Sequence, residues 1–182
     1  IKVKHEINVI RFSLFHMVPH IIVDVREHKL HQLLSKQLPD IEIELKSLEI
    51  GDVLIENQEE DSKLQLIFER KTDRDLAASI KDGRYKEQKI RMKNSYLCHH
   101  CTYIIENEDG LLDTSVMSNG TYTSAIMNTM YRDKLHVIVV HGIQETAEWI
   151  ATVFNKIKEL QSDGKKVGIT FSTFDMLHAG HI

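Results

Sequence analysis

The chain has 182 residues, of which 42% are hydrophobic and 27% charged, with 8 Gly, 2 Pro and 2 Cys. This composition suits one packed domain with a short appendage and excludes a disordered chain, a collagen-like repeat and a disulfide scaffold. The 23 basic and 27 acidic residues give a net charge of -4, so a polyanionic ligand would have to bind a local basic patch.

The amino-terminal half predicts alternating strands and helices. Residues 1–20 contain no recognisable motif and are expected to be an extension of unknown role. The pattern then predicts a strand over 21–25, a helix over 30–38, and strands over 41–45, 52–56 and 64–71. A polar stretch separates the last two strands, which indicates a hairpin.

The second half continues this alternation. It predicts a helix over 73–95 that is interrupted near Gly83, a strand over 103–106, a helix over 124–131, a strand over 136–141 and a helix over 145–160. We therefore expect an α/β fold with a central mixed sheet flanked by helices.

Location is indicated only indirectly. No apolar run approaches the roughly 20 residues of a membrane span, and no secretory signal is recognisable. We expect an intracellular protein without membrane contact.

Three polar residues of the predicted hairpin carry the first candidate chemistry. Residues two apart on a strand share a face, so Glu69 and Lys71 point the same way, and the hairpin can bring Asp52 beside them. Two carboxylates suit Mg²⁺, and a lysine can orient or deprotonate an attacking water. The alternative is an ordinary salt bridge on a surface strand.

The flanking segments favour the metal site. Asp24 interrupts the most apolar predicted strand, where a carboxylate is costly unless a cation pairs with it. Downstream, Asp75 begins a helix, and residues 81–93 that follow carry six basic residues against two acidic ones. These six are Lys81, Arg84, Lys86, Lys89, Arg91 and Lys93. We interpret them as a local patch for phosphate contact, with a solvated helix face as the alternative.

These residues resemble the XPF-type structure-specific endonucleases. The order Gly51-Asp52, a variable strand pair, Glu69-Arg70-Lys71, three residues and Asp75 is similar to the family signature GD(n)ERK(x3)D. Further similar segments are Val23-Asp24-Val25-Arg26-Glu27, residues 75–88, Tyr103-Ile104-Ile105-Glu106 and Glu145-Thr146-Ala147. The resemblance assigns a nuclease domain to residues 21–160.

The resemblance implies a restriction-endonuclease-like fold that cleaves branched or flapped DNA with Mg²⁺ or Mn²⁺. It also implies a location in the nucleus or at the site of DNA replication in a eukaryote or virus, and otherwise in the cytoplasm. It implies that Asp24, Asp52 and Glu69 bind the metal. Lys71 would act on the water, Arg70 would hold a phosphate or brace the site, and Glu27 and Asp75 would assist. The residues implied in DNA contact are Arg26, Lys81, Arg84, Lys86, Gln88 and Lys89.

Partners and substrate leave alternatives open. Family members usually dimerise through the last helices of the nuclease domain, so the apolar stripe from Trp149 to Ile157 is a candidate homo- or heterodimer interface; packing on its own sheet is the alternative. No glycine-rich helix-hairpin-helix pair follows residue 160. Two other functions therefore remain open: a phosphodiesterase for a small or cyclic nucleotide, and a DNA-binding partner subunit of another nuclease.

Residues 161–182 are expected to be a linker and the truncated start of a second domain. A strand is predicted over 167–171, and the following segment resembles the HxGH motif of cytidylyltransferase-type nucleotidyltransferases. His178 and His181 would then bind nucleotide phosphates at a helix amino terminus.

The segment Cys98-His99-His100-Cys101 has the spacing of half a zinc site. A structural zinc site needs four ligands, and these neighbours are poorly spaced to supply all four to one ion. We interpret the segment as a reduced stretch before a strand, with adventitious metal binding as the alternative.

Overall fold

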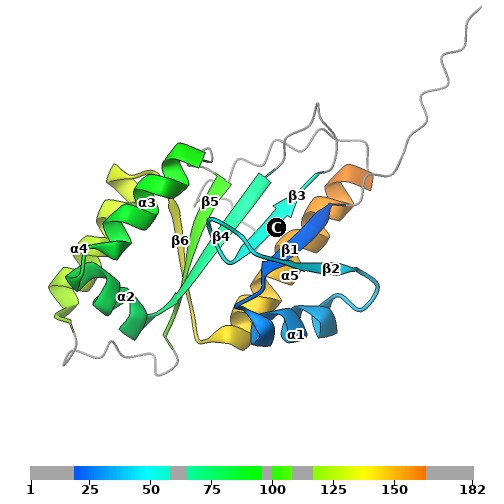
Figure 1. The fold of residues 1–182 in the computed structure, drawn as a ribbon, viewed down its shortest axis with the longest axis horizontal. Coiled ribbons are helices and arrows are strands. Elements are labelled where there is room, and N and C mark those ends of the chain that lie inside the picture. Colours follow the sequence, from blue (N-terminus) through cyan, green and yellow to red (C-terminus); the bar gives the residue numbers. More distant parts are fainter. Residues whose placement is uncertain (1–18, 58–64, 96–99, 108–116, 163–182) are drawn as a thin grey trace, which may run out of the picture.

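The computed structural model describes residues 19–57, 65–95, 100–107 and 117–162 (Figure 1). Most of the predicted extension over 1–20 lies outside the described residues. The same holds for most of the predicted segment over 161–182, including His178 and His181, and for Cys98 and His99.

A six-stranded mixed sheet forms the centre of the molecule. Its strands are β1 (His20–Asp24), β2 (Ile43–Lys46), β3 (Val53–Glu56), β4 (Gln65–Thr72), β5 (Cys101–Glu106) and β6 (His136–Val140). Their order across the sheet is β2-β1-β3-β4-β5-β6. The β1–β3 and β3–β4 pairs are antiparallel, whereas β1–β2, β4–β5 and β5–β6 are parallel. The predicted α/β fold with a central mixed sheet is confirmed.

Helices cover both faces of this sheet (Figure 1). They are α1 (His28–Gln37), α2 (Asp73–Lys81), α3 (Arg84–Ser95), α4 (Asn119–Met127), the π-helical turn η2 (Asn128–Arg132) and α5 (Ile143–Ser162). One buried cluster joins α1 and α5 to the sheet, and a second joins α2, α3 and α4 to its opposite face. None of the helices in the described ranges has the length and apolar composition that a membrane span requires.

The two clusters divide each central strand by alternation. Along β4, Phe68 packs in the α1/α5 cluster, whereas Ile67 packs in the α2/α3/α4 cluster. Since successive strand residues point to opposite faces, the polar residues that follow are assigned to faces in the same way. The sheet thereby fixes the directions of the site residues.

The predicted β3–β4 hairpin is confirmed, with Val53 opposite Phe68 and Glu56 opposite Gln65. Gly51 precedes it with a φ of +79°, and a Cβ there would lie 2.6 Å from Cγ1 of Ile67. Only glycine avoids both the backbone strain and this contact. The close approach at Gly51 seats Asp52 at the start of β3.

The helices differ in part from the predicted ranges. The predicted break near Gly83 separates α2 from α3, as expected. The helix predicted over 124–131 begins earlier, because Ser118 caps α4 by accepting a hydrogen bond from the backbone N–H of Thr121 at 3.3 Å. It then continues into the π-helical turn η2.

Candidate active site

Three adjacent strands bring Asp24, Asp52 and Glu69 to one region of the sheet. The backbone N–H of Asp24 donates to the carbonyl of Asp52 at 2.9 Å, and that of Asp52 donates to the carbonyl of Phe68 at 2.8 Å. Alternation from Ile22, Leu54 and Ile67 places all three carboxylates on the α2/α3/α4 face. We call these three residues, with Lys71, the acidic cluster.

Asp52 is a carboxyl group whose charge the fold disfavours. Burial, followed by the negative charge of Glu69, raises the pKa of Asp52 to about 7. A hydrogen bond from the backbone N–H of Arg70 to Oδ2, at 2.8 Å, opposes the shift only partly. A cation beside Asp52 and Glu69 would relieve this repulsion.

Glu69 is 8% exposed, and neighbouring side chains orient it. Its Oε1 accepts from Nζ of Lys71 at 3.1 Å and from Nε2 of Gln88 at 3.0 Å. The structure therefore places Gln88, which the resemblance implied in DNA contact, against Glu69. The lysine predicted to share a face with Glu69 does so.

Asp24 is fully buried, and both of its oxygens accept hydrogen bonds. Oδ1 accepts from the backbone N–H and Nε of Arg26, at 2.9 and 2.6 Å, and Oδ2 accepts from the backbone N–H of Leu48 at 2.8 Å. Burial would raise the pKa of Asp24, but these hydrogen bonds outweigh it and hold the pKa below its ordinary value. The Arg26 side chain is itself 71% exposed.

The donor set suits a hard cation. Oδ1 of Asp52 and Oε2 of Glu69 accept no hydrogen bond from the part of the chain that the structure describes. Across those same residues, no three His, Cys, Asp or Glu side chains form a ready group for a metal ion. Two open carboxylate oxygens fit Mg²⁺, which keeps several waters and needs few protein ligands.

Arg70 lies on the other face of β4, away from the acidic cluster. Nε and Nη2 donate to the two oxygens of Glu106 at 2.9 and 2.6 Å, and Nη1 donates to Glu27 at 2.8 Å. Burial opposes the charge of Arg70, but the hydrogen bonds to Glu106 outweigh it and raise its pKa. Of the two roles implied for Arg70, this geometry corresponds to bracing.

Sequence reasoning missed the roles of Glu106 and Thr146. Glu106 is 2% exposed, and its Oε1 also accepts from the hydroxyl of Thr146 at 2.7 Å. A signal was present, because a carboxylate that ends the apolar strand β5 requires a cationic partner. What the sequence lacked was the identity of that partner, which lies 36 residues earlier.

Asp75 has a local structural role in this geometry. Its backbone N–H donates to Oγ1 of Thr72 at 3.1 Å, and Oγ1 of Thr72 donates to its carboxylate at 2.9 Å. Asp75 and Thr72 therefore form a cap at the amino terminus of α2, on the exposed surface.

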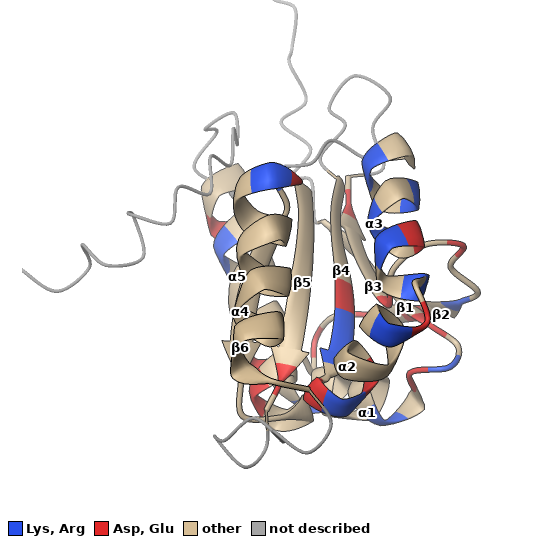
Figure 2. Ribbon diagram, turned by 90° about the vertical axis from the view of Figure 1, so that its left-hand side faces the viewer, with Lys and Arg blue, Asp and Glu red and all other residues tan. Residues whose placement is uncertain are grey.

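The residues of the predicted basic patch divide between surface and interior. Figure 2 shows basic positions along the ribbons of α2 and α3. Lys81, Arg84 and Lys86 are exposed on these helices, although Arg84 pairs with Asp82 at 2.6 Å. Lys89, in contrast, is 5% exposed and its Nζ lies 2.7 Å from Oδ2 of Asp133.

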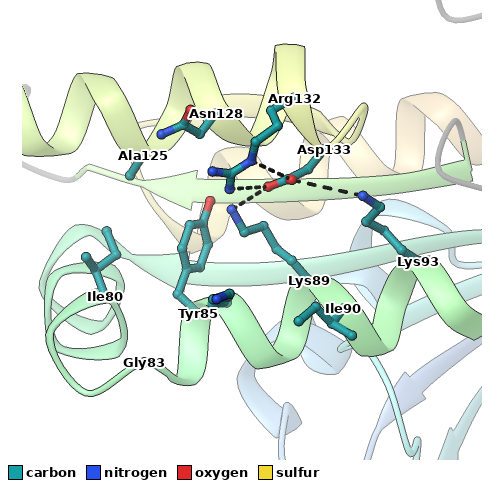
Figure 3. A pocket seen from close by; sticks show the side chains of 11 residues that line it. Ile80, Gly83, Tyr85, Lys89, Ile90, Lys93, Ala125, Asn128, Arg132 and Asp133 are labelled. Carbon is teal, nitrogen blue, oxygen red and sulfur yellow. Dashed lines mark hydrogen bonds and ion pairs between the residues drawn. The ribbon is translucent and has the colours of Figure 1, made fainter.

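Lys89 lines a pocket of about 430 Å³ between α3 and the α4–η2 segment. Its ammonium points toward Asp133 in Figure 3. It stacks on the ring of Tyr85 at 4.4 Å and donates to Thr129 at 3.1 Å. Its spacing from the buried Tyr85 and Met92 was a signal for burial. As placed, the Lys89 ammonium is paired with Asp133 and buried within the protein.

The apolar stripe of α5 packs largely on its own sheet. Ile150, Phe154 and Ile157 are at most 1% exposed within the α1/α5 cluster. Trp149 meets Phe68 edge to face, with ring centroids 5.6 Å apart. For these residues the structure favours the alternative of internal packing. In the Cys98–Cys101 segment, Cys101 is buried in β5.

Comparisons with known proteins identify the family of this chain. Residues 23–153 match the ERCC4 domain. Crossover junction endonuclease MUS81 of Candida albicans is 33% identical over 127 residues, which cover 68% of this chain and 20% of that protein. Structure-specific endonuclease subunit MUS81 of Homo sapiens is 30% identical over 125 residues, which cover 64% and 22%. The chain thus spans about a fifth of the length of these relatives.

Solved structures share the fold. XPF from Aeropyrum pernix superimposes with a TM-score of 0.62 at 24% identity, over 79% of this chain and 67% of that one. XPF from Aeropyrum pernix in complex with DNA gives a TM-score of 0.55 at 21% identity, over 90% and 76%. Because the ERCC4 match spans 23–153 and includes the acidic cluster, the chain belongs to the ERCC4 domain family.

Proposed function

We propose that this chain is the nuclease domain of a structure-specific endonuclease that hydrolyses phosphodiester bonds in branched or flapped DNA. The observation that carries the proposal is the pairing of Asp52 with Glu69 beside Lys71, in a geometry that raises the pKa of Asp52 to about 7. Paired carboxylates with an ammonium are suited to metal-assisted phosphodiester hydrolysis. Membership in the ERCC4 domain family supports the same chemistry.

The proposed cofactor is Mg²⁺ or Mn²⁺. Asp52 and Glu69 would hold it through their open oxygens, and Asp24 would join them where the exposed Arg26 guanidinium releases Oδ1. The ion would polarise a phosphate oxygen and lower the pKa of a bound water. Lys71 would orient that water and counter the charge that develops on the phosphate.

Other residues would support these groups. Gln88 would hold Glu69 in place, Arg70 and Glu27 would brace β4 from the opposite face, and Asp75 would fix the start of α2. Lys71 and Gln88 reach Glu69 from different elements, so the Glu69 carboxylate is oriented before any ligand binds.

DNA contact would fall mainly to exposed basic residues. We propose Arg26, Lys81, Arg84 and Lys86 as phosphate contacts, since all four are exposed and lie on or beside the elements of the acidic cluster. Such contacts position a duplex without reading its sequence. This suits a nuclease that recognises the shape of a junction.

A partner subunit is part of the same proposal. The human and rat relatives are named as subunits of a structure-specific endonuclease. Within the stripe from Trp149 to Ile157, the half-buried Trp149 and Val153 keep surface with which a homo- or heterodimer partner could make contact. We further propose action in the nucleus, or wherever the source organism replicates its DNA.

The test compares DNA shapes with labelled flap, fork and plain duplex substrates, with Mg²⁺ or with EDTA. We expect cleavage of flap and fork in Mg²⁺ alone, and a loss of about 100-fold or more in Asp52→Ala and Lys71→Ala. The exposed residues Asp40 and Lys36 supply matched controls, Asp40→Ala and Lys36→Ala, which should cut like the wild type.

Two outcomes would contradict the proposal. If the wild type cuts no substrate, or if Asp52→Ala and Lys71→Ala cut as well as their controls, the nuclease assignment fails. A cyclic dinucleotide in the same assay tests the small-nucleotide alternative, which preferential cleavage of that compound would establish instead.

A further inference from the structure

A buried network of hydrogen-bonded side chains lies on the α1/α5 face of the sheet, opposite the acidic cluster. It runs from the Thr146 hydroxyl to Glu106, from Glu106 to the Arg70 guanidinium, and from there to Glu27. The side chains of Glu106, Arg70 and Glu27 are 2%, 18% and 18% exposed. These residues therefore contact one another in a largely buried network.

Each hydrogen bond in this network has a defined donor and a defined acceptor. Arg70 grips Glu106 in a two-point fork, which restrains the guanidinium more tightly than a single contact would. The hydroxyl of Thr146 has one proton and lies 2.7 Å from Glu106 against 3.2 Å from the Gly142 carbonyl, so Glu106 is the better acceptor. Thr146 thus fixes the carboxylate that fixes Arg70.

The consequence reaches the acidic cluster through the backbone of β4. The N–H of Arg70 donates to Oδ2 of Asp52 at 2.8 Å, so the orientation of that peptide group sets the position of the Asp52 carboxylate. Glu69 and Lys71 flank Arg70 and point to the opposite face. Because the Arg70 side chain is held on one face, the side chains of Glu69 and Lys71 are oriented toward the other face.

The same guanidinium restrains the segment after Asp24. Nη1 of Arg70 donates to Glu27, whose backbone N–H donates to the carbonyl of Asp24 at 2.9 Å. Arg70 thus links the segments that carry Asp24 and Asp52, through its side chain to Glu27 and through its backbone N–H to Asp52, while Glu69 is its neighbour on β4. Its own anchor, Glu106 with Thr146, comes from β5 and α5.

We propose that Glu106 and Thr146 are positioning residues for phosphodiester hydrolysis, which act through Arg70 to align the acidic cluster. This inference rests on the proposed nuclease function. Thr146 ties the first turns of α5 to the site, so the placement of that helix and the geometry of the acidic cluster are coupled.

The test separates positioning from general stability. Thr146→Val keeps the shape of the side chain without the hydroxyl, Thr146→Ser restores the hydroxyl, and Ile150→Val removes one methyl group from the core on the same helix. We expect the single-turnover cleavage rate of Thr146→Val to fall about 10- to 100-fold, with flap affinity retained. Thr146→Ser and Ile150→Val should stay within about twofold of the wild type, since neither removes a donor to Glu106.

A second readout needs neither metal nor substrate. The NMR resonance of the Arg70 backbone amide, which reports its hydrogen bond to Asp52, should move in Thr146→Val and in Glu106→Gln and return in Thr146→Ser. An unmoved amide, or a Thr146→Val rate equal to that of Ile150→Val, would overturn the inference. If the wild type cuts no DNA, the nuclease assignment fails, and the amide resonance alone decides whether Thr146 and Glu106 set this geometry.

Discussion

Asp52 links the charge of the acidic cluster to the stability of the fold. Burial and the negative charge of Glu69 raise its pKa to about 7, whereas an aspartate in an unfolded chain titrates near pH 4. Between these values the folded state binds more protons than the unfolded state. The stability from this group is therefore complete below about pH 4 and is lost as the pH rises through 7.

We predict that Asp52→Asn stabilises the metal-free protein at high pH. The amide cannot ionise, and its oxygen can still accept from the Arg70 N–H. Its free energy of unfolding should exceed that of the wild type by roughly 2 to 4 kcal/mol at pH 8 and by little near pH 4. Urea denaturation across this range measures the difference, with the exposed Asp40→Asn as control. A difference that does not change with pH would contradict the prediction.

The local sequence pattern predicted the residues of the acidic cluster, but it missed the residues on the opposite face that hold Arg70. Alternation along 64–71 was enough to place Glu69 beside Lys71, and the hairpin was enough to add Asp52. The roles of Glu106 and Thr146 depend on contacts over 36 and 40 residues, which spacing along the chain does not encode. A carboxylate in a buried strand indicates that a cationic partner must exist, but the sequence does not show which residue that partner is.

At the scale of helices and strands, three glycines differ in whether an added Cβ would cause backbone strain, a steric contact, both or neither. Gly51 has a φ of +79° and no room for a Cβ, Gly83 has a φ of +83° with open space around it, and Gly120 lies in α4 with open space and no left-handed backbone. The β3–β4 hairpin and the α2–α3 break thus use glycine for partly different reasons.

We predict that alanine substitution at these three glycines changes the free energy of unfolding by different amounts. Gly51→Ala should cost about 3 kcal/mol or more, because it combines the left-handed φ with the 2.6 Å approach to Ile67. Gly83→Ala should cost about 1 kcal/mol from the backbone alone. Gly120→Ala should stabilise by up to about 1 kcal/mol as a helix residue. Thermal and urea unfolding give the order, and equal effects at Gly51 and Gly83 would contradict it.

Helix boundaries show where sequence pattern weakens. The break at Gly83 was predictable because glycine interrupts an otherwise continuous helical pattern. The start of α4 at Asn119 was not, since Gly120 and Thr121 have low helix propensity and the Ser118 cap supplies the missing stability. The buried stripe of α5 was recognised, but its periodicity alone could not distinguish its own sheet from a partner.

For the molecule as a whole, the net charge of -4 conceals two kinds of lysine on α3. Lys86 is exposed, whereas Lys89 is buried and balances Asp133. Hydrogen bonds from Arg132 first, and then from Lys89, overcome burial and lower the pKa of Asp133 to about 2. A sum of charges therefore overstates the positive charge that α3 offers to DNA.

We predict opposite phenotypes for these two lysines. Lys86→Gln should leave the free energy of unfolding unchanged and make the dependence of log Kobs for duplex DNA on log salt concentration shallower by about 1, as one phosphate contact is lost. Lys89→Gln should cost roughly 2 kcal/mol or more, because it breaks a buried ion pair that Arg132 compensates only in part. Its salt dependence should equal that of the wild type. Urea unfolding and fluorescence anisotropy at several salt concentrations measure both quantities. A shallower salt dependence in Lys89→Gln would mean that the ammonium leaves Asp133 when DNA binds, and that α3 presents more positive charge than its unbound geometry allows.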